Sequence, residues 1–317
     1  MRGVNWACRH GLISGTEPAI DYFLSMRLAD VATGFSPYAR GDDLDVMTDV
    51  ITWTAVCDDF FDGMAGDDPG VAESVVEALS GVIGRNPVPL DPLVPFTPLV
   101  TATADLWERM AHPMGELWRA RARRNWRRFL HSFLVEAEVR RSRSAPTLPE
   151  YFALRRETMA MYLYLDAAER AGGYEVPDRV LASEPVEELC RLQIEILACC
   201  NDVHSVEHEE ARGDTHNLVL VLERTQGLRR SEAIETLREW VHRRSQRFLH
   251  VASHLLGTGN PLGLDADNRE LAEQYVMTMM YQLRTTYDWS RSTARYSSRW
   301  QAASSFSSQQ RPHYINL

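Results

Sequence analysis

Two short polar segments have the residue types and the spacing that divalent-metal chemistry requires. In the first, Asn201, Ser205 and Glu209 lie four residues apart, so on an α-helix their side chains form one stripe of oxygen donors. An amide, a hydroxyl and a carboxylate in this arrangement suit a hard cation such as Mg²⁺, which prefers oxygen ligands in octahedral geometry. Taken alone, the stripe is more typical of a polar helix face that hydrogen-bonds a neighbouring helix.

The second segment is Cys57–Asp62, which reads CDDFFD. On a helix Asp58 and Asp62 share a face and Asp59 lies beside it, so the three carboxylates repel one another unless a cation neutralises them. Apolar residues precede the acids, which predicts that the acids lie at the mouth of a buried cavity. An isolated segment of this kind also fits a solvated helix end.

Two further segments could bind an anion. The twin arginines of Leu154–Thr158 stand at the polar end of an apolar helix, and Arg295 is followed directly by Tyr296. A guanidinium and a phenol are good hydrogen-bond donors to a phosphate oxygen. All 34 basic residues are arginine, and this lack of lysine excludes Schiff-base catalysis, P-loop phosphate binding and kinase chemistry.

The elements that must position these residues are predicted to be helices. Apolar residues recur at helical spacing over residues 17–30, 42–62, 71–84, 101–140, 150–172, 185–211, 230–256 and 266–293. We find no convincing alternating strand pattern, so the sequence predicts one all-α domain over residues 1–300. The polar residues 301–317 are expected to form a flexible C-terminal tail. The six arginines within residues 119–128 are interpreted as a solvated helix face.

Composition narrows the class of protein further. The chain has 317 residues, of which 44% are hydrophobic, which is enough for one large core or two modest ones. A net charge of −10 argues against a general nucleic-acid binder. No apolar run is long enough to span a membrane, and the first residues lack the apolar block of a signal peptide. The five cysteines follow no metal-ligand pattern and are interpreted as reduced thiols of a cytoplasmic protein.

Together these segments resemble the bacterial class I terpene synthases. The aspartate-rich DDxxD motif of that family is matched by Asp58, Asp59 and Asp62. Its second metal motif, NDxxSxxKE, is matched by Asn201–Glu209, with Asn201, Asp202, Ser205 and Glu209 at the motif positions. The resemblance covers roughly residues 5–296 and includes the GDTHNLV of Gly213–Val219. It implies a single-domain α-helical bundle of the class I terpenoid synthase type, with a central apolar cavity.

The resemblance also assigns roles to single residues outside the metal motifs. The diphosphate-sensing arginine of the family falls on Arg155, its linker position on Thr158 and its effector on Met159. The C-terminal Arg-Tyr pair falls on Arg295 and Tyr296. Two positions depart from the family pattern: His208 replaces a lysine that contacts diphosphate, and Met159 stands where glycine is frequent. Arg212, one turn after His208, could supply the missing contact.

The implied activity is that of a terpene cyclase, a lyase that ionises a prenyl diphosphate with Mg²⁺. Three Mg²⁺ ions are expected together with the substrate diphosphate. Farnesyl diphosphate is the expected substrate, geranylgeranyl and geranyl diphosphate are alternatives, and a homodimer is left open. The resulting carbocation must be kept from water in an apolar pocket, where aromatic faces stabilise it. Trp289 resembles a cavity-lining tryptophan of the family; Trp53, Phe60, Phe61 and Tyr162 are further candidates, although core packing is their more common role.

Three other functions each fit part of the sequence. His204, Glu207 and His208 spell H-x-x-E-H, the motif of inverted zinc proteases, but a protease leaves CDDFFD, Arg155 and the Arg-Tyr pair unexplained. A prenyl-chain elongating synthase shares the fold but needs a second DDxxD motif. A non-enzymatic helical scaffold explains the amphipathic helices but not the polar residues at matched positions.

Overall fold

The computed structural model describes residues 2–63, 65, 68–84, 96–142 and 146–296, apart from the side chains of His208 and Arg212. The predicted tail at residues 301–317 lies outside these residues. No extended strand occurs in the described ranges, so the all-α prediction is confirmed. The helices are α1 (Arg2–Arg9), α2 (Glu17–Ser25), α3 (Leu28–Phe35), α4 (Asp42–Phe61), α6 (Pro69–Gly84), α7 (Thr97–Ala111), α8 (Glu116–Ser142), α9 (Leu148–Thr158), α10 (Met161–Gly172), α11 (Asp178–Leu181), α12 (Glu184–Arg212), α13 (Leu218–Gln226), α14 (Arg230–Leu256), α15 (Ala266–Ser290) and the 3₁₀ turn η1 (Ala294–Tyr296).

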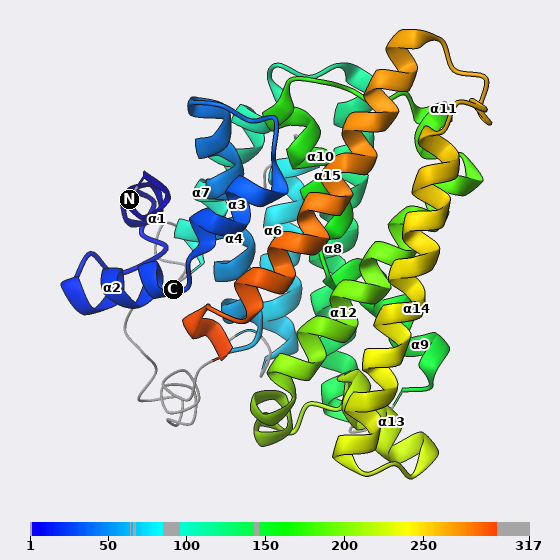
Figure 1. The fold of residues 1–317 in the computed structure, drawn as a ribbon. Helices are drawn as coiled ribbons and strands as arrows, with labels where there is room; N and C mark the ends of the chain where they lie inside the picture. Colours follow the sequence, from blue (N-terminus) through cyan, green and yellow to red (C-terminus); the bar gives the residue numbers. More distant parts are fainter. Residues whose placement is uncertain (1, 64, 66–67, 85–95, 143–145, 297–317) are drawn as a thin grey trace.

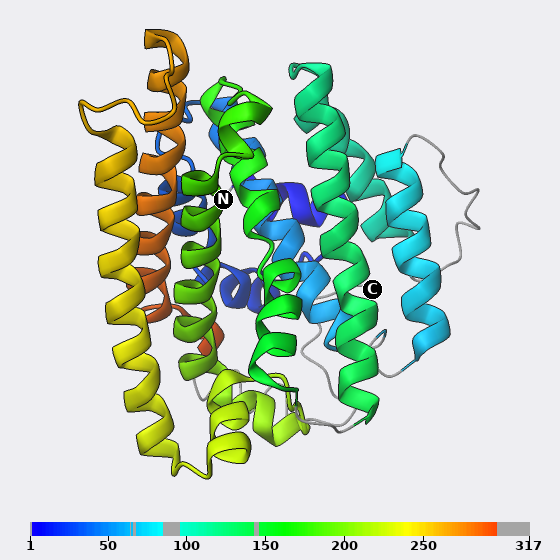
Figure 2. The same cartoon turned by 90° about the vertical axis from the view of Figure 1, so that its right-hand side faces the viewer.

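The long helices run roughly side by side and form a bundle (Figure 1). Helices α12 and α14 pack along one another, and α15 lies against both α12 and α3. Helix α6 lies at the opposite edge of the bundle from α14, as the turned view shows (Figure 2). The short helix α13 crosses one end of the bundle, where it joins α12 to α14.

Helix α4 is the centre of the largest apolar cluster because it is apolar around most of its circumference. Its Trp53 is fully buried and stacks on Trp126 of α8 with ring centroids 4.9 Å apart. The Trp53 indole nitrogen donates a hydrogen bond to Thr103 Oγ1 at 2.8 Å, which satisfies its one polar atom. A helix that is hydrophobic all round must be surrounded by other elements. Its acidic C-terminal end therefore emerges inside the bundle.

Three of the predicted helices are broken in the structure. The segment 17–30 divides at Arg27, whose φ is +56°, and the segment 150–172 divides at Ala160, whose φ is +54°. The segment 101–140 divides between Ala111 and Glu116, where Pro113 and Gly115 interrupt the helical pattern. Pro113 and Gly115 indicate a helix break in the sequence itself, whereas a left-handed arginine or alanine has no sequence signature.

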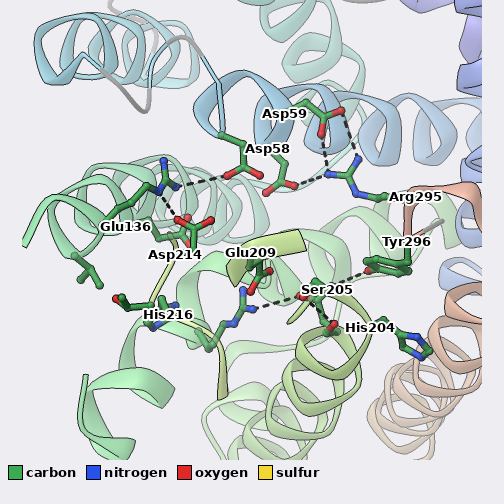
Figure 3. A pocket seen from close by; sticks show the side chains of 16 residues that line it. Asp58, Asp59, Glu136, His204, Ser205, Glu209, Asp214, His216, Arg295 and Tyr296 are labelled. Atoms are coloured by element: carbon green, nitrogen blue, oxygen red, sulfur yellow. Dashed lines mark hydrogen bonds and ion pairs between the residues drawn. The ribbon is translucent and has the colours of Figure 1, made fainter. Parts of the chain in front are cut away.

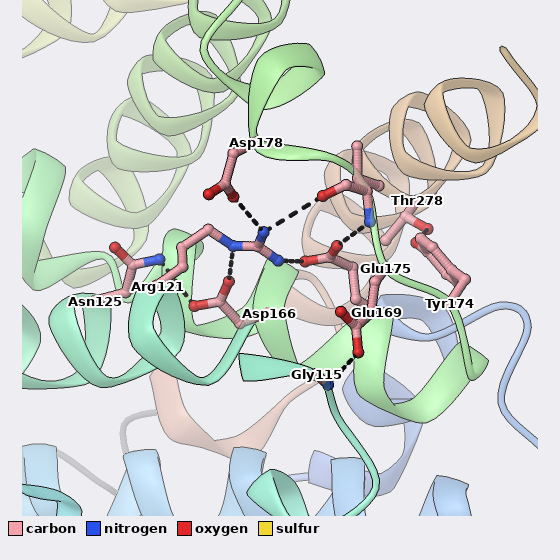
Figure 4. A network of polar contacts seen from close by, with 10 residues as sticks. Gly115, Arg121, Asn125, Asp166, Glu169, Tyr174, Glu175, Asp178 and Thr278 are labelled. Atoms are coloured by element: carbon pink, nitrogen blue, oxygen red, sulfur yellow. Dashed lines mark hydrogen bonds and ion pairs between the residues drawn. The ribbon is translucent and has the colours of Figure 1, made fainter. Parts of the chain in front are cut away.

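The arginine-rich stretch of α8 is only partly a solvated face, and the prediction is wrong for Arg121. Its guanidinium is buried and pairs with Glu169 and with Asp166, the latter at 3.1 Å (Figure 4). Asn125 donates to the second oxygen of Asp166 at 2.8 Å. This network ties α8 to α10, because a buried carboxylate requires charged or hydrogen-bonding partners.

Helices α3 and α15 approach one another unusually closely at Gly34. A Cβ atom built on Gly34 would lie 1.8 Å from Oγ1 of Thr285, closer than any real contact. Only glycine therefore fits at this point of α3. The approach matters for the site because α3 and α15 both contribute to a cavity wall described below.

Two observations bear on the expectations drawn from composition. None of the described helices is long and apolar enough to cross a membrane. The five cysteines are free, as expected for reduced thiols.

Candidate active site

A polar cavity of about 120 Å³ lies at the end of the bundle where α4 and α12 bring their acidic residues together (Figure 3). Its lining is dominated by charged groups drawn from five elements and one loop. Six carboxylates and three guanidinium groups face it: Asp58, Asp59, Asp62, Glu136, Glu209, Asp214, Arg140, Arg155 and Arg295. The surplus of carboxylates gives the cavity a negative charge that favours cations.

The DDxxD acids lie at the C-terminal end of α4, where the helix dipole disfavours negative charge. Arg295 of η1 compensates them: its Nη2 lies 2.5 Å from Asp58 Oδ2 and 3.0 Å from Asp59 Oδ1. Asp58 faces the cavity with half of its side chain exposed, and desolvation by the surrounding protein raises the pKa of its carboxyl to about 6, with Asp62 adding to the rise. The predicted acidic motif and the predicted Arg-Tyr pair are therefore direct neighbours.

The second predicted metal motif lies on the facing wall. Asn201, Ser205 and Glu209 all line the cavity from one face of α12. The Asn201 amide donates to the Tyr296 hydroxyl at 2.7 Å, and the Asn217 amide donates to Glu209 Oε2 at 2.9 Å. Burial raises the pKa of Glu209 to about 7.

Asp202, the second residue of the motif, has a different position from its neighbours. It is fully buried and accepts hydrogen bonds from the Tyr151 hydroxyl, at 2.7 Å, and from the Leu218 backbone amide. Arg155 also forms an ion pair with the Asp202 carboxylate. Asp202 thus joins α9, α12 and α13 and holds the second motif in place from behind.

Arg155 lies in the last turns of α9 and is buried, whereas Arg156 is exposed. In addition to Asp202, its guanidinium lies 3.3 Å from Asn201 Oδ1 and 3.2 Å from the Tyr151 hydroxyl. Burial alone lowers the pKa of Arg155, but the paired Asp202 raises it well above its ordinary value. Arg155 is therefore a permanent positive charge on the cavity wall.

The predicted linker and effector residues lie at the break between α9 and α10. Thr158 is the last residue of α9, Met159 caps it, and Ala160 takes a left-handed conformation before α10 begins. Because the chain leaves the helical path here, the Thr158 and Met159 carbonyls accept no backbone hydrogen bond among those of the described residues. Both residues line an apolar cavity, where carbonyl oxygens of this kind present partial negative charge.

The apolar cavity has a volume of about 190 Å³ and adjoins the polar one. Five residues line both: Asp58, Arg155, Asn201, Arg295 and Tyr296. Its aromatic walls come from Trp289, Tyr164, Phe35 and Phe129. Trp289 is fixed by a hydrogen bond from its indole nitrogen to the Met26 carbonyl at 2.7 Å. A charged chamber therefore opens directly onto an apolar one.

Four of the predicted pocket aromatics are not part of this wall. Trp53, Phe60 and Phe61 are buried in the core, where Phe61 stacks on Phe133 with centroids 4.2 Å apart. Tyr162 is half-buried and packs against two apolar clusters. We replace these candidates with Tyr164, Phe35 and Phe129, which the sequence analysis missed because each lies within an ordinary apolar helix pattern.

The sequence analysis also missed three charged residues of the polar cavity. Glu136 and Arg140 lie one turn apart on α8, and Asp214 lies in the loop after α12. Burial raises the pKa of Glu136 to about 8. The four-residue spacing of Glu136 and Arg140 indicates that they share one face of a helix. Only the fold shows that this face lies towards Asp62.

The zinc-protease alternative finds little support in the geometry. The His204 ring lies against Tyr296, with centroids 5.6 Å apart, and Glu207 is exposed. The side chain of His208 lies outside the described residues, as does that of Arg212. In the described part of the chain, no three His, Cys, Asp or Glu side chains gather closely enough to hold a metal by themselves. The two acidic motifs instead face one another across the cavity.

Comparisons with known proteins agree with this arrangement. The family model described as terpene synthase family 2, C-terminal metal binding, matches residues 49–247. Pentalenene synthase from Streptomyces arenae is 33% identical over 296 residues, covering 92% of this chain and 85% of that protein. A (−)-β-caryophyllene synthase from Saccharothrix espanaensis is 34% identical over 298 residues, with coverages of 92% and 82%.

Solved structures of similar proteins have the same fold. Germacradien-4-ol synthase from Streptomyces citricolor superposes with a TM-score of 0.80 at 28% identity, covering 91% of each chain. Linalool/nerolidol synthase from Streptomyces clavuligerus, in complex with 2-fluorogeranyl diphosphate, gives a TM-score of 0.81 at 27% identity, covering 92% of this chain and 96% of that one. The extent of the family match and the identity to these relatives show that this chain belongs to the terpene synthase family.

Proposed function

We propose that this protein is a Mg²⁺-dependent class I terpene synthase that ionises farnesyl diphosphate and cyclises the hydrocarbon chain. The observation that carries the proposal is the pair of adjoining cavities, one charged and one apolar, which share five lining residues. A prenyl diphosphate has the same two-part character. Its head suits the charged chamber and its hydrocarbon chain suits the apolar one.

The donor set of the polar cavity fits a hard divalent cation. The proposed ligands are all oxygen donors, namely Asp58, Asp59 and Asp62 on one wall and Asn201, Ser205 and Glu209 on the other. The surplus of carboxylates over arginines at this cavity would be offset by divalent cations bound together with the anionic diphosphate. Bound Mg²⁺ would supply charge neutralisation to the leaving diphosphate.

The other roles in catalysis are proposed for side chains and backbone carbonyls of this protein. Arg155, Arg295 and Tyr296 are positioned to donate hydrogen bonds to the diphosphate as it departs, because they line both cavities. Thr158 and Met159 present carbonyl dipoles to the developing cation at the helix break. Trp289, Tyr164, Phe35 and Phe129 exclude water and offer aromatic faces to the cation.

The relatives support farnesyl diphosphate as the substrate: the caryophyllene synthase is named as cyclising (2E,6E)-farnesyl diphosphate. The proposal takes residues 1–300 as one synthase domain. The test is incubation of the purified chain with Mg²⁺ and, separately, geranyl, farnesyl and geranylgeranyl diphosphate, followed by gas chromatography and phosphate release. Cyclic C15 products from farnesyl diphosphate are expected. If none of the three substrates released diphosphate, the proposed function would be wrong.

A further inference from the structure

Arg140 is a charged residue of the polar cavity that none of the recognised motifs includes. It lies near the C-terminal end of α8, and only 22% of its side chain is exposed. Its Nη2 lies 3.6 Å from Asp62 Oδ1, and its Nε lies 2.7 Å from Asp214 Oδ1. Arg140 therefore bridges the end of the first metal motif and the loop that follows the second.

The two other cavity arginines are held in a similar way. Arg295 pairs with Asp58 and Asp59, and Arg155 pairs with Asp202. A carboxylate that serves as a metal ligand gives up much of its charge to the metal and holds a guanidinium less strongly. Arg295 and Arg140 both pair with proposed metal ligands, so both would be available to a second anion once those ligands are engaged.

The second motif of this chain also has one cation fewer than the family pattern. His208 replaces the lysine of the second motif, and no lysine is present anywhere in the sequence. We propose that Arg140 is a third diphosphate-binding arginine, held by Asp62 and Asp214 until substrate binds and then contacting the diphosphate. This inference rests on the proposed function for the identity of the anion. A guanidinium fork suits the role because it can bridge two phosphate oxygens.

A purely structural role for Arg140 makes a different prediction about Asp214. If Arg140 only holds α8 against the loop after α12, loss of either Arg140 or Asp214 breaks their ion pair and weakens the site equally. If Arg140 binds diphosphate, Asp214 is its competitor. Removal of the Asp214 charge then leaves diphosphate affinity unchanged or increases it, whereas removal of the Arg140 guanidinium decreases it.

The experiment is calorimetric titration of inorganic pyrophosphate into the full chain at saturating Mg²⁺. It compares the wild type with Arg140→Gln, Arg140→Lys, Asp214→Asn and the control Arg141→Gln. Arg141 is a fair control because it is 52% exposed and pairs with Glu138 on its own helix. Circular dichroism checks that each variant is folded. If Arg140→Gln does not fold, Arg140→Lys provides the comparison with the wild type.

We expect Arg140→Gln to weaken pyrophosphate binding about tenfold or more, as loss of a charge-assisted hydrogen bond does. Arg140→Lys should fall between it and the wild type, and Arg141→Gln should match the wild type. Equal losses in Arg140→Gln and Asp214→Asn, or no loss in Arg140→Gln, would overturn the inference. Wild-type turnover of prenyl diphosphates, measured alongside, separates this result from the proposed function, which fails if pyrophosphate binds but no substrate is converted.

Discussion

At the scale of single residues, neighbours in the sequence have opposite environments in this site. Arg155 is buried among Asp202, Asn201 and Tyr151, while Arg156 is exposed on the same helix. Asn201 faces the cavity, while Asp202 faces the core. A rotation of about 100° per residue separates each pair. Residue type alone therefore does not decide function here, and a shift of one position would exchange a site residue for a structural one.

The first prediction compares the two arginines. Arg155→Lys should lower turnover about 100-fold, because an ammonium group cannot span Asp202, Asn201 and a phosphate oxygen together. Arg156→Lys should retain near wild-type turnover. The measurement is steady-state turnover of farnesyl diphosphate with Mg²⁺, at a temperature where urea unfolding shows both variants folded. The reverse ranking would show that the assignment of Arg155 is wrong by one residue.

The second prediction concerns pH. Burial raises the pKa of Asp58 to about 6 and that of Glu209 to about 7, so in the metal-free site both carboxyls hold a proton as the pH falls below these values. Because Mg²⁺ and protons compete for the same oxygens, metal affinity should fall as pH is lowered.

The Mg²⁺ concentration that gives half-maximal turnover is therefore expected to rise between pH 8 and pH 6. Titrations of Mg²⁺ at saturating substrate in overlapping buffers measure it. A half-maximal concentration that does not change with pH would contradict the assignment of these two acids as ligands.

At the scale of elements, the long helices were predictable, and two of their three interruptions were not. Helices α4, α12 and α14 follow the predicted segments within a few residues, because a long apolar periodicity has few other interpretations. The break at Ala160 depends on a left-handed alanine, which no signal in the sequence marks. The same break places Thr158 and Met159 on the wall of the apolar cavity, so the feature that was hardest to predict lies at the proposed site.

The third prediction tests the contact between α3 and α15. Gly34→Ala should destabilise the protein by about 1–3 kcal/mol, because the new methyl group overlaps Thr285 and forces the two helices apart. Turnover should also fall, since α3 carries Phe35 and α15 carries Trp289 of the apolar cavity. Urea unfolding and steady-state kinetics measure the two effects.

Gly84→Ala is the matched control, because a Cβ at Gly84 meets nothing within 4 Å among the residues that the structure describes. In the double variant Gly34→Ala/Thr285→Gly the obstructing side chain is absent, so part of the loss should be recovered. Equal stability of Gly34→Ala and Gly84→Ala would show that the close approach is not a constraint.

At the scale of the whole molecule, the site is assembled from segments distributed along almost the whole described chain. The family resemblance located Asp58, Asn201, Arg155 and Arg295 in the sequence, and the fold brings all four to the wall shared by the two cavities. Residues without a motif, such as Glu136 and Phe129, could not be found in advance because only tertiary packing selects which face of a helix lines a cavity.

The fourth prediction concerns ligand-induced stability. Mg²⁺ and inorganic pyrophosphate together should raise the free energy of unfolding by about 2.7 kcal/mol at 100 times the dissociation constant. Either one alone should give much less, because Arg295 and Asp58 pair with each other in the free protein. Pyrophosphate can replace Asp58 as the partner of Arg295, and Mg²⁺ can replace Arg295 as the partner of Asp58, so both ligands are needed to give each residue a new partner. Thermal unfolding with each ligand alone and with both measures this effect. Full stabilisation by pyrophosphate without Mg²⁺ would contradict the role of the acidic motifs.

The pairing of Arg295 with Asp58 has a consequence for the order in which the protein is made. These two residues are separated by 237 positions in the chain, and the contact joins α4 to the turn that follows α15. A growing chain on the ribosome has already produced CDDFFD, the second motif and most of the apolar wall before Arg295 is added. The acids of α4 therefore remain without this counter-charge through most of synthesis, and the diphosphate site gains its last recognised donors, Arg295 and Tyr296, only after nearly all of its hydrocarbon chamber exists. Because Arg295 and Tyr296 come late in the sequence, a nascent chain lacks the complete proposed diphosphate site until nearly all of its apolar cavity has been synthesised.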